Sequence, residues 1–225
     1  MPGKNSETDS STGEEKRSVW REILSWIEVI VIAVVLALAI DNFIIINATV
    51  PSGSMEKTIL TGSRVLGTRF SYWFSEPQRG DIVVFWYQID KEKDKNLSFF
   101  KKNRTKYIKR IIGLPGETVE IRDGQVYIDS VPLEEDYING EWIVANGPFL
   151  FEVPEGCYLM LGDNRNNSSD ARYWPNIAYL EGLASTADEA RPYSYVPKEE
   201  ILGKAYFCYW PFSQAGSLYS EDRGK

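Results

Sequence analysis

The stretch KYIKRIIGLPGETVEI, residues Lys106–Ile121, indicates the fold class of this chain most directly. Its first half is rich in β-branched and aromatic residues, which is typical of a β-strand, and its GLPG segment at 113–116 predicts a tight turn. Alternate side chains of a strand point to the same side, so Tyr107, Lys109 and Ile111 are expected to share one face. The pattern therefore predicts a strand lysine bracketed by an aromatic and a β-branched residue, which favours burial of its amine.

Similar runs lie on both sides of this stretch and are separated by turn residues. The sequence predicts strands at Arg64–Gly67, Asp81–Trp86, Tyr107–Ile112, Thr118–Arg122, Gln125–Ile128, Phe149–Val153, Cys157–Leu161 and Leu202–Tyr209. Asp123-Gly124 between two of these runs is a strong two-residue hairpin signal, and Asn139-Gly140 is another turn signal. Short strands joined by turns indicate a mainly β fold with an antiparallel sheet.

These strands define one β-rich domain over residues 47–212, in a chain of 225 residues that is 43% hydrophobic and 13% aromatic. That composition is ample for a packed core. Residues 175–194 have no β pattern, although their LEGLASTADEA segment can form a short helix, and we expect a surface insertion there. Residues 213–225 are expected to form a C-terminal tail.

An apolar segment, Ile23–Ile46, precedes this domain. Its length is close to the roughly 20 residues that a helix needs to cross a bilayer, and Trp26 suits an interfacial anchor. A buried helix of a soluble protein and the core of a cleaved signal peptide are the alternatives, because the uninterrupted run Val29–Ile40 is short. The uniformly apolar middle favours a retained transmembrane helix over residues 23–46.

The orientation of this helix rests on the basic residues around it. Lys16, Arg17 and Arg21 favour a cytoplasmic N-terminus, but basic residues also follow the span, so the bias is weak. A large domain after a first span can still be translocated. We therefore expect residues 1–22 to form a disordered cytoplasmic tail in the cell-membrane protein, and the domain from about Ala48 onward to be extracytoplasmic.

Composition excludes several classes of function. Lys and Arg number 25 against 32 Asp and Glu, a net charge of -7, which disfavours a general nucleic-acid binder. The chain has two cysteines, Cys157 and Cys208, and no histidine, so neither a zinc site nor a disulfide framework is expected. Both cysteines are expected in the core, with a single bridge left open. The absence of histidine also removes the usual catalytic base.

The motif VPSGSMEKTIL, residues Val50–Leu60, follows the apolar segment directly. Gly53 between Ser52 and Ser54 lets the backbone turn sharply and present side-chain and N–H groups to a bound carbonyl. Without histidine, a lysine is the most capable group to activate a serine, provided that burial lowers its pKa. Lys109 fits this requirement. An ordinary loop serine and an edge-strand lysine that blocks aggregation are the alternatives.

A third motif, YLMLGDNRNNSSDARYW at 158–174, runs from an apolar strand into a dense polar cluster. A calcium-binding loop is disfavoured, because the glycine expected at its sixth position is missing. An Asx-rich turn is the stronger alternative.

Together and in this order, the three motifs resemble bacterial type I signal peptidases, the membrane-anchored serine/lysine proteases that remove signal peptides. The similar blocks are PSGSM at 51–55, RGDIVVF at 79–85, YIKRIIGLPGE at 107–117, GDNRNNSSDAR at 162–172, and VPKEEILGKA followed by WP within 196–211. The resemblance implies an antiparallel catalytic domain of the signal peptidase type and cleavage after small residues of the Ala-x-Ala kind through an acyl-enzyme. It implies no cofactor, and as partners it implies preprotein signal peptides, the lipid bilayer and the nearby export machinery.

The resemblance also assigns roles to individual residues. Ser54 is expected to be the nucleophile and Lys109 the general base, with Ser52 and the Ser54 N–H stabilising the oxyanion. Ser168 is expected to orient the lysine. The remaining site residues are Asp163, Arg110, Asp170 and Arg172, which hold the architecture, and Met55, Ile59, Tyr107 and Ile108, which form substrate pockets. The chain departs from the family pattern at Lys57, where a proline is usual, and at Asn166 and Ala171, which often are Asp and Ser.

Two other hypotheses stay open. A serine/lysine self-cleaving repressor of the LexA type has related chemistry, but this chain lacks an obvious DNA-binding module. A membrane-tethered β module that binds a partner without catalysis is disfavoured by the presence of both Ser54 and Lys109. The aromatic run Tyr72–Phe74 is expected either to enter the membrane interface or to pack in the core.

Overall fold

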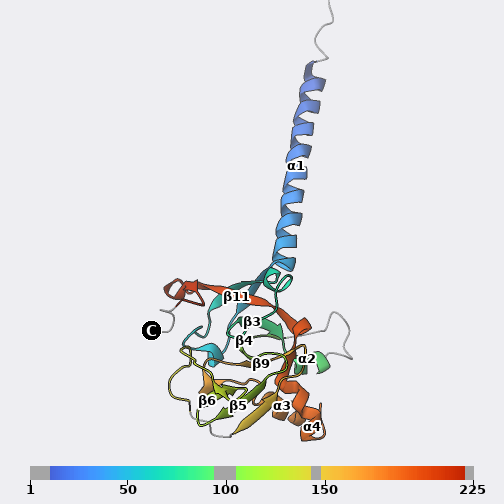
Figure 1. Ribbon diagram of the computed structural model, residues 1–225. Coiled ribbons are helices and arrows are strands. Elements are labelled where there is room, and N and C mark those ends of the chain that lie inside the picture. The colour runs from blue at the N-terminus through green and yellow to red at the C-terminus, as the bar shows by residue number, and fades with distance from the viewer. Residues whose placement is uncertain (1–10, 94–104, 143–147, 221–225) are drawn as a thin grey trace, which may run out of the picture. The chain divides into compact units, whose positions relative to one another are not determined.

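A computed structural model describes residues 11–93, 105–142 and 148–220 of the chain (Figure 1). The chain divides into two units, residues 1–44 and 45–225. The first unit contains the helix α1 (Ser11–Phe43), and the second is a β-rich domain.

Helix α1 contains the expected membrane span, but its bounds differ from those predicted. Its apolar part, Trp20–Ile40, has 21 residues and a mean hydropathy of 2.8, enough in length and composition to cross a bilayer. The helix begins at Ser11, within the predicted disordered tail, where Glu, Lys and Arg are good helix formers. It ends at Phe43, before the predicted boundary, because β-branched isoleucines favour the strand β1 (Ile45–Thr49).

The β-rich domain consists of two antiparallel sheets. The larger sheet has eight strands in the order β1-β2-β11-β3-β4-β9-β10, with β12 paired to β11, and the smaller has four in the order β7-β6-β5-β8. The remaining strand bounds are β2 (Arg64–Thr68), β3 (Ile82–Trp86), β4 (Lys106–Gly113), β5 (Thr118–Arg122), β6 (Gln125–Ile128), β7 (Val131–Pro132), β8 (Phe149–Glu152), β9 (Cys157–Leu161), β10 (Tyr195–Pro197), β11 (Ile201–Trp210) and β12 (Gly216–Ser217). Figure 1 shows β11, β3, β4 and β9 following one another through the domain, with β5 and β6 beyond β9.

These strands confirm the predicted mainly β, antiparallel fold. Strands β5, β6 and β9 have the predicted bounds, and each of the other predicted strands differs by at most one residue at either end. The hairpin turn at Asp123-Gly124 has positive φ angles of 52° and 74°, which the two-residue turn between β5 and β6 requires. The short strands β1, β7, β10 and β12 were outside the prediction, because their sequences carry little alternation.

Both faces of the larger sheet are buried at its strand β3. On β3, Val83 and Phe85 pack in a core shared with the smaller sheet, whereas Ile82 and Val84 pack in a second core with β1 and β2. Burial on both faces explains why β3 reads as a continuous apolar run. Cys208 is buried in the second core, Cys157 is partly buried, and both are free, so the two cysteines form no disulfide.

Two segments are more integral to the domain than predicted. The predicted surface insertion 175–194 contains α3 (Trp174–Leu180), α4 (Ala187–Ala190) and the short helix η6 (Arg191–Ser194), and Ala178 and Ala190 are buried. The predicted tail 213–225 contains the 3-10 helix η8 (Phe212–Gln214) and β12, and places Leu218 in the second core. Small apolar residues in a polar sequence gave no periodic signal for this packing.

Candidate active site

The predicted nucleophile lies in a short turn after β1, and the predicted base lies on strand β4 of the larger sheet. Ser54 lies in the single turn η1 (Gly53–Met55), which follows β1 after the extended residue Ser52. Lys109 lies on β4, where Lys106–Arg110 pair with β3. The structure therefore brings the two residues together from positions that are 55 residues apart.

Lys109 and Ser54 are buried and form a short hydrogen bond. The Lys109 Nζ donates to Ser54 Oγ at 2.6 Å, and the two residues are only 3% and 6% exposed. Burial lowers the pKa of Lys109 from 10.5 to about 8, although the charges of Asp170 and Asp163 oppose this effect. Among the described residues, Lys109 takes part in none of the ion pairs around the site, which all use arginines. An amine in this state can accept a proton near neutral pH.

A cavity of about 440 Å³ opens beside this pair. Its wall includes residues 48–54, residues 105–109 and Asn167 and Ser169. The Ser52 hydroxyl is exposed and lies 3.3 Å from Ser54 Oγ, so it can donate to an oxygen bound beside the nucleophile.

The predicted substrate-pocket residues fall into two groups. Tyr107 and Ile108 line the cavity. Met55 and Ile59 are 0% and 1% exposed and lie in the second core with Ile108, so they support the cavity from behind and are not among its lining residues. Their apolar character signalled burial correctly, but a sequence does not distinguish a pocket wall from the core beneath it.

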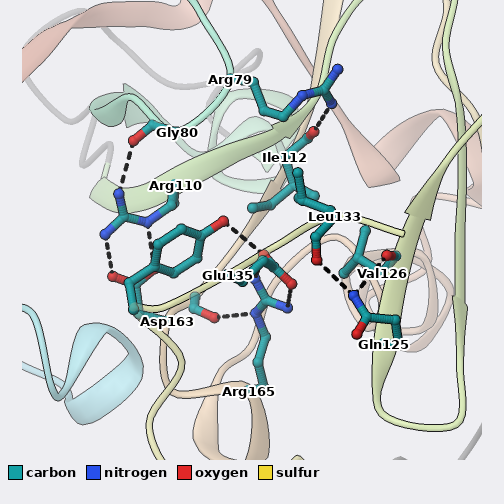
Figure 2. A network of polar contacts seen from close by, with 12 residues as sticks. Arg79, Gly80, Arg110, Ile112, Gln125, Val126, Leu133, Glu135, Asp163 and Arg165 are labelled. Carbon is teal, nitrogen blue, oxygen red and sulfur yellow. Dashed lines mark hydrogen bonds and ion pairs between the residues drawn. The ribbon is translucent and has the colours of Figure 1, made fainter. Parts of the chain in front are cut away.

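The predicted supporting residues form two buried ion pairs next to the dyad. Arg110 donates from Nε and Nη2 to Asp163 Oδ1 and Oδ2 at 2.8 and 2.7 Å (Figure 2). Arg172 holds Asp170 in the same bidentate manner, with both distances 2.8 Å. Burial alone would raise the pKa of Asp170, but the Arg172 charge and hydrogen bonds lower it, so the carboxylate stays ionised.

Ser168 lies in the same polar layer but without the predicted contact to the lysine. Its hydroxyl is buried and has no partner of ordinary hydrogen-bond geometry among the described residues, although it helps to lower the pKa of Asp170. The hydroxyl is close to the nucleophile turn, because a Cβ at Gly162 would lie 2.3 Å from Ser168 Oγ and 2.4 Å from the Ser54 carbonyl oxygen. Gly162 therefore has to be a glycine for this layer to close.

Sequence reasoning also missed the residues that fix the nucleophile turn. The Asn164 N–H donates to the Ser54 carbonyl at 3.1 Å, and its side-chain amide donates to the Gly53 carbonyl at 3.0 Å. Thr58 Oγ1 donates to Asp163 Oδ2 at 2.6 Å. Asn164 and Gly162 belong to the polar motif at 158–174, so their position next to Asp163 was the available signal.

Comparison with known proteins identifies the family of the chain. A family model described as "Signal peptidase, peptidase S26" matches residues 23–210. The chain belongs to the signal peptidase family. A signal peptidase I of Leptolyngbya laminosa is 37% identical over 196 residues, which is 87% of this chain and 84% of the relative. A probable signal peptidase I-2 of Synechocystis is 37% identical over 86% of this chain and 78% of its own.

A crystal structure of a signal peptidase I from Enterococcus faecalis is 30% identical, with a TM-score of 0.39, and covers 58% of this chain and 97% of that chain. As a member of the signal peptidase family, the chain is a serine peptidase and therefore a hydrolase.

Proposed function

We propose that this signal peptidase removes signal peptides from exported preproteins with Ser54 as nucleophile and Lys109 as its base. The observation that carries the proposal is the 2.6 Å hydrogen bond between the buried Lys109 amine and Ser54 Oγ. A buried lysine whose partner is a hydroxyl and not a carboxylate is neutral at lower pH than an exposed one. This gives the chain a base that can replace the missing histidine.

The proposed reaction has two steps. Ser54 Oγ attacks the scissile carbonyl carbon while its proton passes to the neutral Lys109 amine, and the Ser52 hydroxyl and the Ser54 N–H donate to the oxyanion. The C–N bond then breaks, and the Lys109 ammonium returns the proton to the leaving amine. A water molecule that gives its proton to Lys109 attacks the resulting ester, and collapse of the second tetrahedral intermediate regenerates Ser54 and releases the signal peptide.

The cavity fits an extended peptide with small side chains. Within the described residues, β1 pairs only with β2, and β9 pairs with β4 only from Arg110 onward. The edges of β1 and of the first half of β4 are thus unpaired, and both contribute to the cavity wall. An extended substrate can add its backbone to such an edge, and the wall formed by Ala48, Val84 and Ile108 favours small apolar side chains such as those of Ala-x-Ala.

We also propose that α1 anchors the enzyme with its N-terminus in the cytoplasm and the β domain outside, where it meets preproteins near the export machinery. The apolar length of Trp20–Ile40 supports the anchor. Of the predicted aromatic run, Tyr72 donates a 2.8 Å hydrogen bond to Asp81, whereas Trp73 and Phe74 are exposed and contact the Phe70 ring. These exposed rings suit the membrane interface.

A cleavage assay with the full chain in detergent tests the proposed reaction. A preprotein with an Ala-x-Ala site is expected to be cut after the second alanine, as read by mass spectrometry. Ser54→Ala and Lys109→Met are expected to abolish the cut, and Lys198→Met, which changes an exposed lysine, is expected to retain it. Cleavage by Ser54→Ala or Lys109→Met at the unmodified rate would contradict the mechanism. In right-side-out vesicles, protection of the β domain from added protease would contradict the orientation.

A further inference from the structure

The segment 134–139, here called the strap, follows β7 of the smaller sheet and contacts every segment that carries the site. It reaches the nucleophile segment, where Lys57 Nζ donates to the Asp136 carbonyl oxygen. It reaches the loop after β9, where the Asn139 N–H donates to the Asp163 carbonyl at 3.1 Å. It reaches β4, where the Arg110 guanidinium lies 3.9 Å from the centre of the Tyr137 ring.

The strongest contact of the strap is the ion pair between Glu135 and Arg165 (Figure 2). Arg165 donates from Nη1 and Nη2 to the two carboxylate oxygens at 3.0 and 2.5 Å, and the two side chains are 0% and 2% exposed. The Arg165 Nε donates to the Gly162 carbonyl at 2.9 Å. Gly162 lies against the Ser54 carbonyl and Ser168. By fixing Arg165, Glu135 therefore also fixes the backbone on which the nucleophile turn rests.

Tyr137 connects this ion pair to the strand that carries the base. Its hydroxyl donates to Glu135 Oε1 at 2.7 Å, and burial and the Glu135 charge raise its pKa, so the hydroxyl remains a donor. Its ring packs against Arg110, the residue next to Lys109. Arg110 is in turn held by Asp163 (Figure 2). A cation at this distance from an aromatic ring is attracted to its face, so the ring restricts Arg110 from a second side.

The strap supplies one of the charges that balance the buried arginines of the site. The three buried arginines of the site, Arg110, Arg165 and Arg172, each have one buried carboxylate. Asp163 and Asp170 belong to the loop after β9, but Glu135 comes from the strap, which follows β7 of the smaller sheet. Removal of the Glu135 charge leaves a fully buried arginine unpaired next to Gly162, and the cost of such a charge is relieved only by local rearrangement.

We propose that the strap is a positioning element for catalysis and that Glu135 and Tyr137 are positioning residues of the Ser54/Lys109 reaction. The inference rests on the proposed function. No strap residue lines the cavity, so the strap acts on the geometry of the reacting groups and not on the bound peptide. Its loss is therefore expected to lower kcat and to leave KM nearly unchanged.

The matched control is a second glutamate–arginine pair of the same domain. Arg79 donates to both carboxylate oxygens of Glu117 at 2.9 and 2.5 Å, and this pair is partly exposed. Arg79 also donates to the Ile112 carbonyl (Figure 2) and, within the described residues, makes no contact with the dyad. Glu135→Gln and Glu117→Gln thus make the same chemical change in two bidentate pairs. Only the first is expected to affect the reaction.

The test uses full-length variants in detergent, at a temperature where circular dichroism shows each to be folded. For Glu135→Gln, kcat on the preprotein and the rate of Ser54 labelling by a fluorophosphonate are expected to fall about tenfold to hundredfold, with KM within about twofold. For Glu117→Gln, all three quantities are expected to stay within about twofold. Tyr137→Phe, which keeps the ring, is expected to lose about threefold in kcat, and this variant decides the question if Glu135→Gln does not fold.

Equal kcat values for Glu135→Gln and Glu117→Gln would overturn the inference, as would a loss that appears in KM alone. Wild-type kcat for Tyr137→Phe would overturn it when Glu135→Gln is unfolded. Ser54→Ala and Lys109→Met are run alongside. If these two retain cleavage, the proposed function fails; if they are inactive while Glu135→Gln is fully active, only the role of the strap fails.

Discussion

Lys109 and Arg110 are consecutive cations on β4, equally buried, and the structure uses them in opposite ways. Consecutive side chains of a strand project to opposite faces. Lys109 meets a neutral hydroxyl, and burial lowers its pKa to about 8. For Arg110 burial acts in the same direction, but the charge and hydrogen bonds of Asp163 outweigh it and raise the pKa.

For these two residues the partner of the buried cation, more than its burial, determines whether the cation keeps or releases its proton. A carboxylate partner fixes the charge and makes the residue structural. A hydroxyl partner leaves the cation without compensation, so it gives up its proton easily and can act as a base.

Replacing the base by a permanent cation breaks the contrast most strongly. Lys109→Arg keeps the positive charge near Ser54, but a guanidinium does not release its proton in proteins. We expect kcat to fall by about a thousandfold, the contribution of a general base. The measurement is single-turnover cleavage of a preprotein, and a loss of less than about tenfold would show that Lys109 does not accept the proton.

Removing Arg110, the cation with a carboxylate partner, is expected to lower the stability of the fold. Arg110→Met leaves Asp163 buried without its partner, and we expect a loss of about 3 to 5 kcal/mol in the free energy of unfolding. Arg79→Met, in the partly exposed pair with Glu117, is expected to lose about 1 kcal/mol. Urea denaturation of both variants measures the difference. Similar losses in the two variants would show that the burial of the Arg110 pair does not increase its contribution to the free energy of unfolding.

Removing the charge of Lys109 is expected to stabilise the fold. Lowering the pKa from 10.5 to about 8 corresponds to a penalty of about 3 kcal/mol for the buried ammonium. Lys109→Met avoids it, so the variant is expected to be more stable below pH 8 by up to this amount. The wild type binds fewer protons folded than unfolded between about pH 8 and 10.5, so its stability rises there and the advantage disappears. If Lys109→Met is less stable than the wild type at pH 7, the buried ammonium does not carry this free-energy cost.

Removing a nearby carboxylate is expected to shift the pKa of Lys109 while the lysine itself stays in place. Asp170 raises the pKa of Lys109, and its removal also leaves the Arg172 charge unpaired, which acts in the same direction. For Asp170→Asn we therefore expect the acidic limb of the kcat/KM profile to move to lower pH, whatever the absolute rate. A limb that moves to higher pH would contradict the electrostatic description.

The same contrast explains which parts of the molecule could be predicted from sequence. Local sequence patterns predicted the β4 strand and the hairpin at Asp123-Gly124. They also predicted the pairing of Ser54 with a strand lysine, because the chain has no histidine. The strap had no such signal, because Glu135 pairs with Arg165, which is 30 positions away in the sequence. Glu135 lies in the acidic run Glu134–Asp136 after a two-residue strand, a run that is typical of a solvated loop, and only the assembled fold shows its burial.

Core and pocket were harder to separate for the same reason. Met55 and Ile59 were expected at substrate pockets because of their place beside the nucleophile, yet both lie in the second core. At the chain ends, the tail expected after residue 212 contributes Leu218 to that core. In each case the apolar residue type indicated burial. Whether the side chain lines the cavity or lies in the core depended on packing between distant segments.

The pKa of Lys109 itself is the most direct test of the central claim. Full-length protein with lysines labelled at Cε can be titrated by NMR, and the spectrum of Lys109→Arg identifies the resonance. We predict a titration near pH 8 that is matched by the acidic limb of kcat/KM. A pKa at the ordinary lysine value of about 10.4 would contradict it, because Lys109 would then be a structural cation like Arg110.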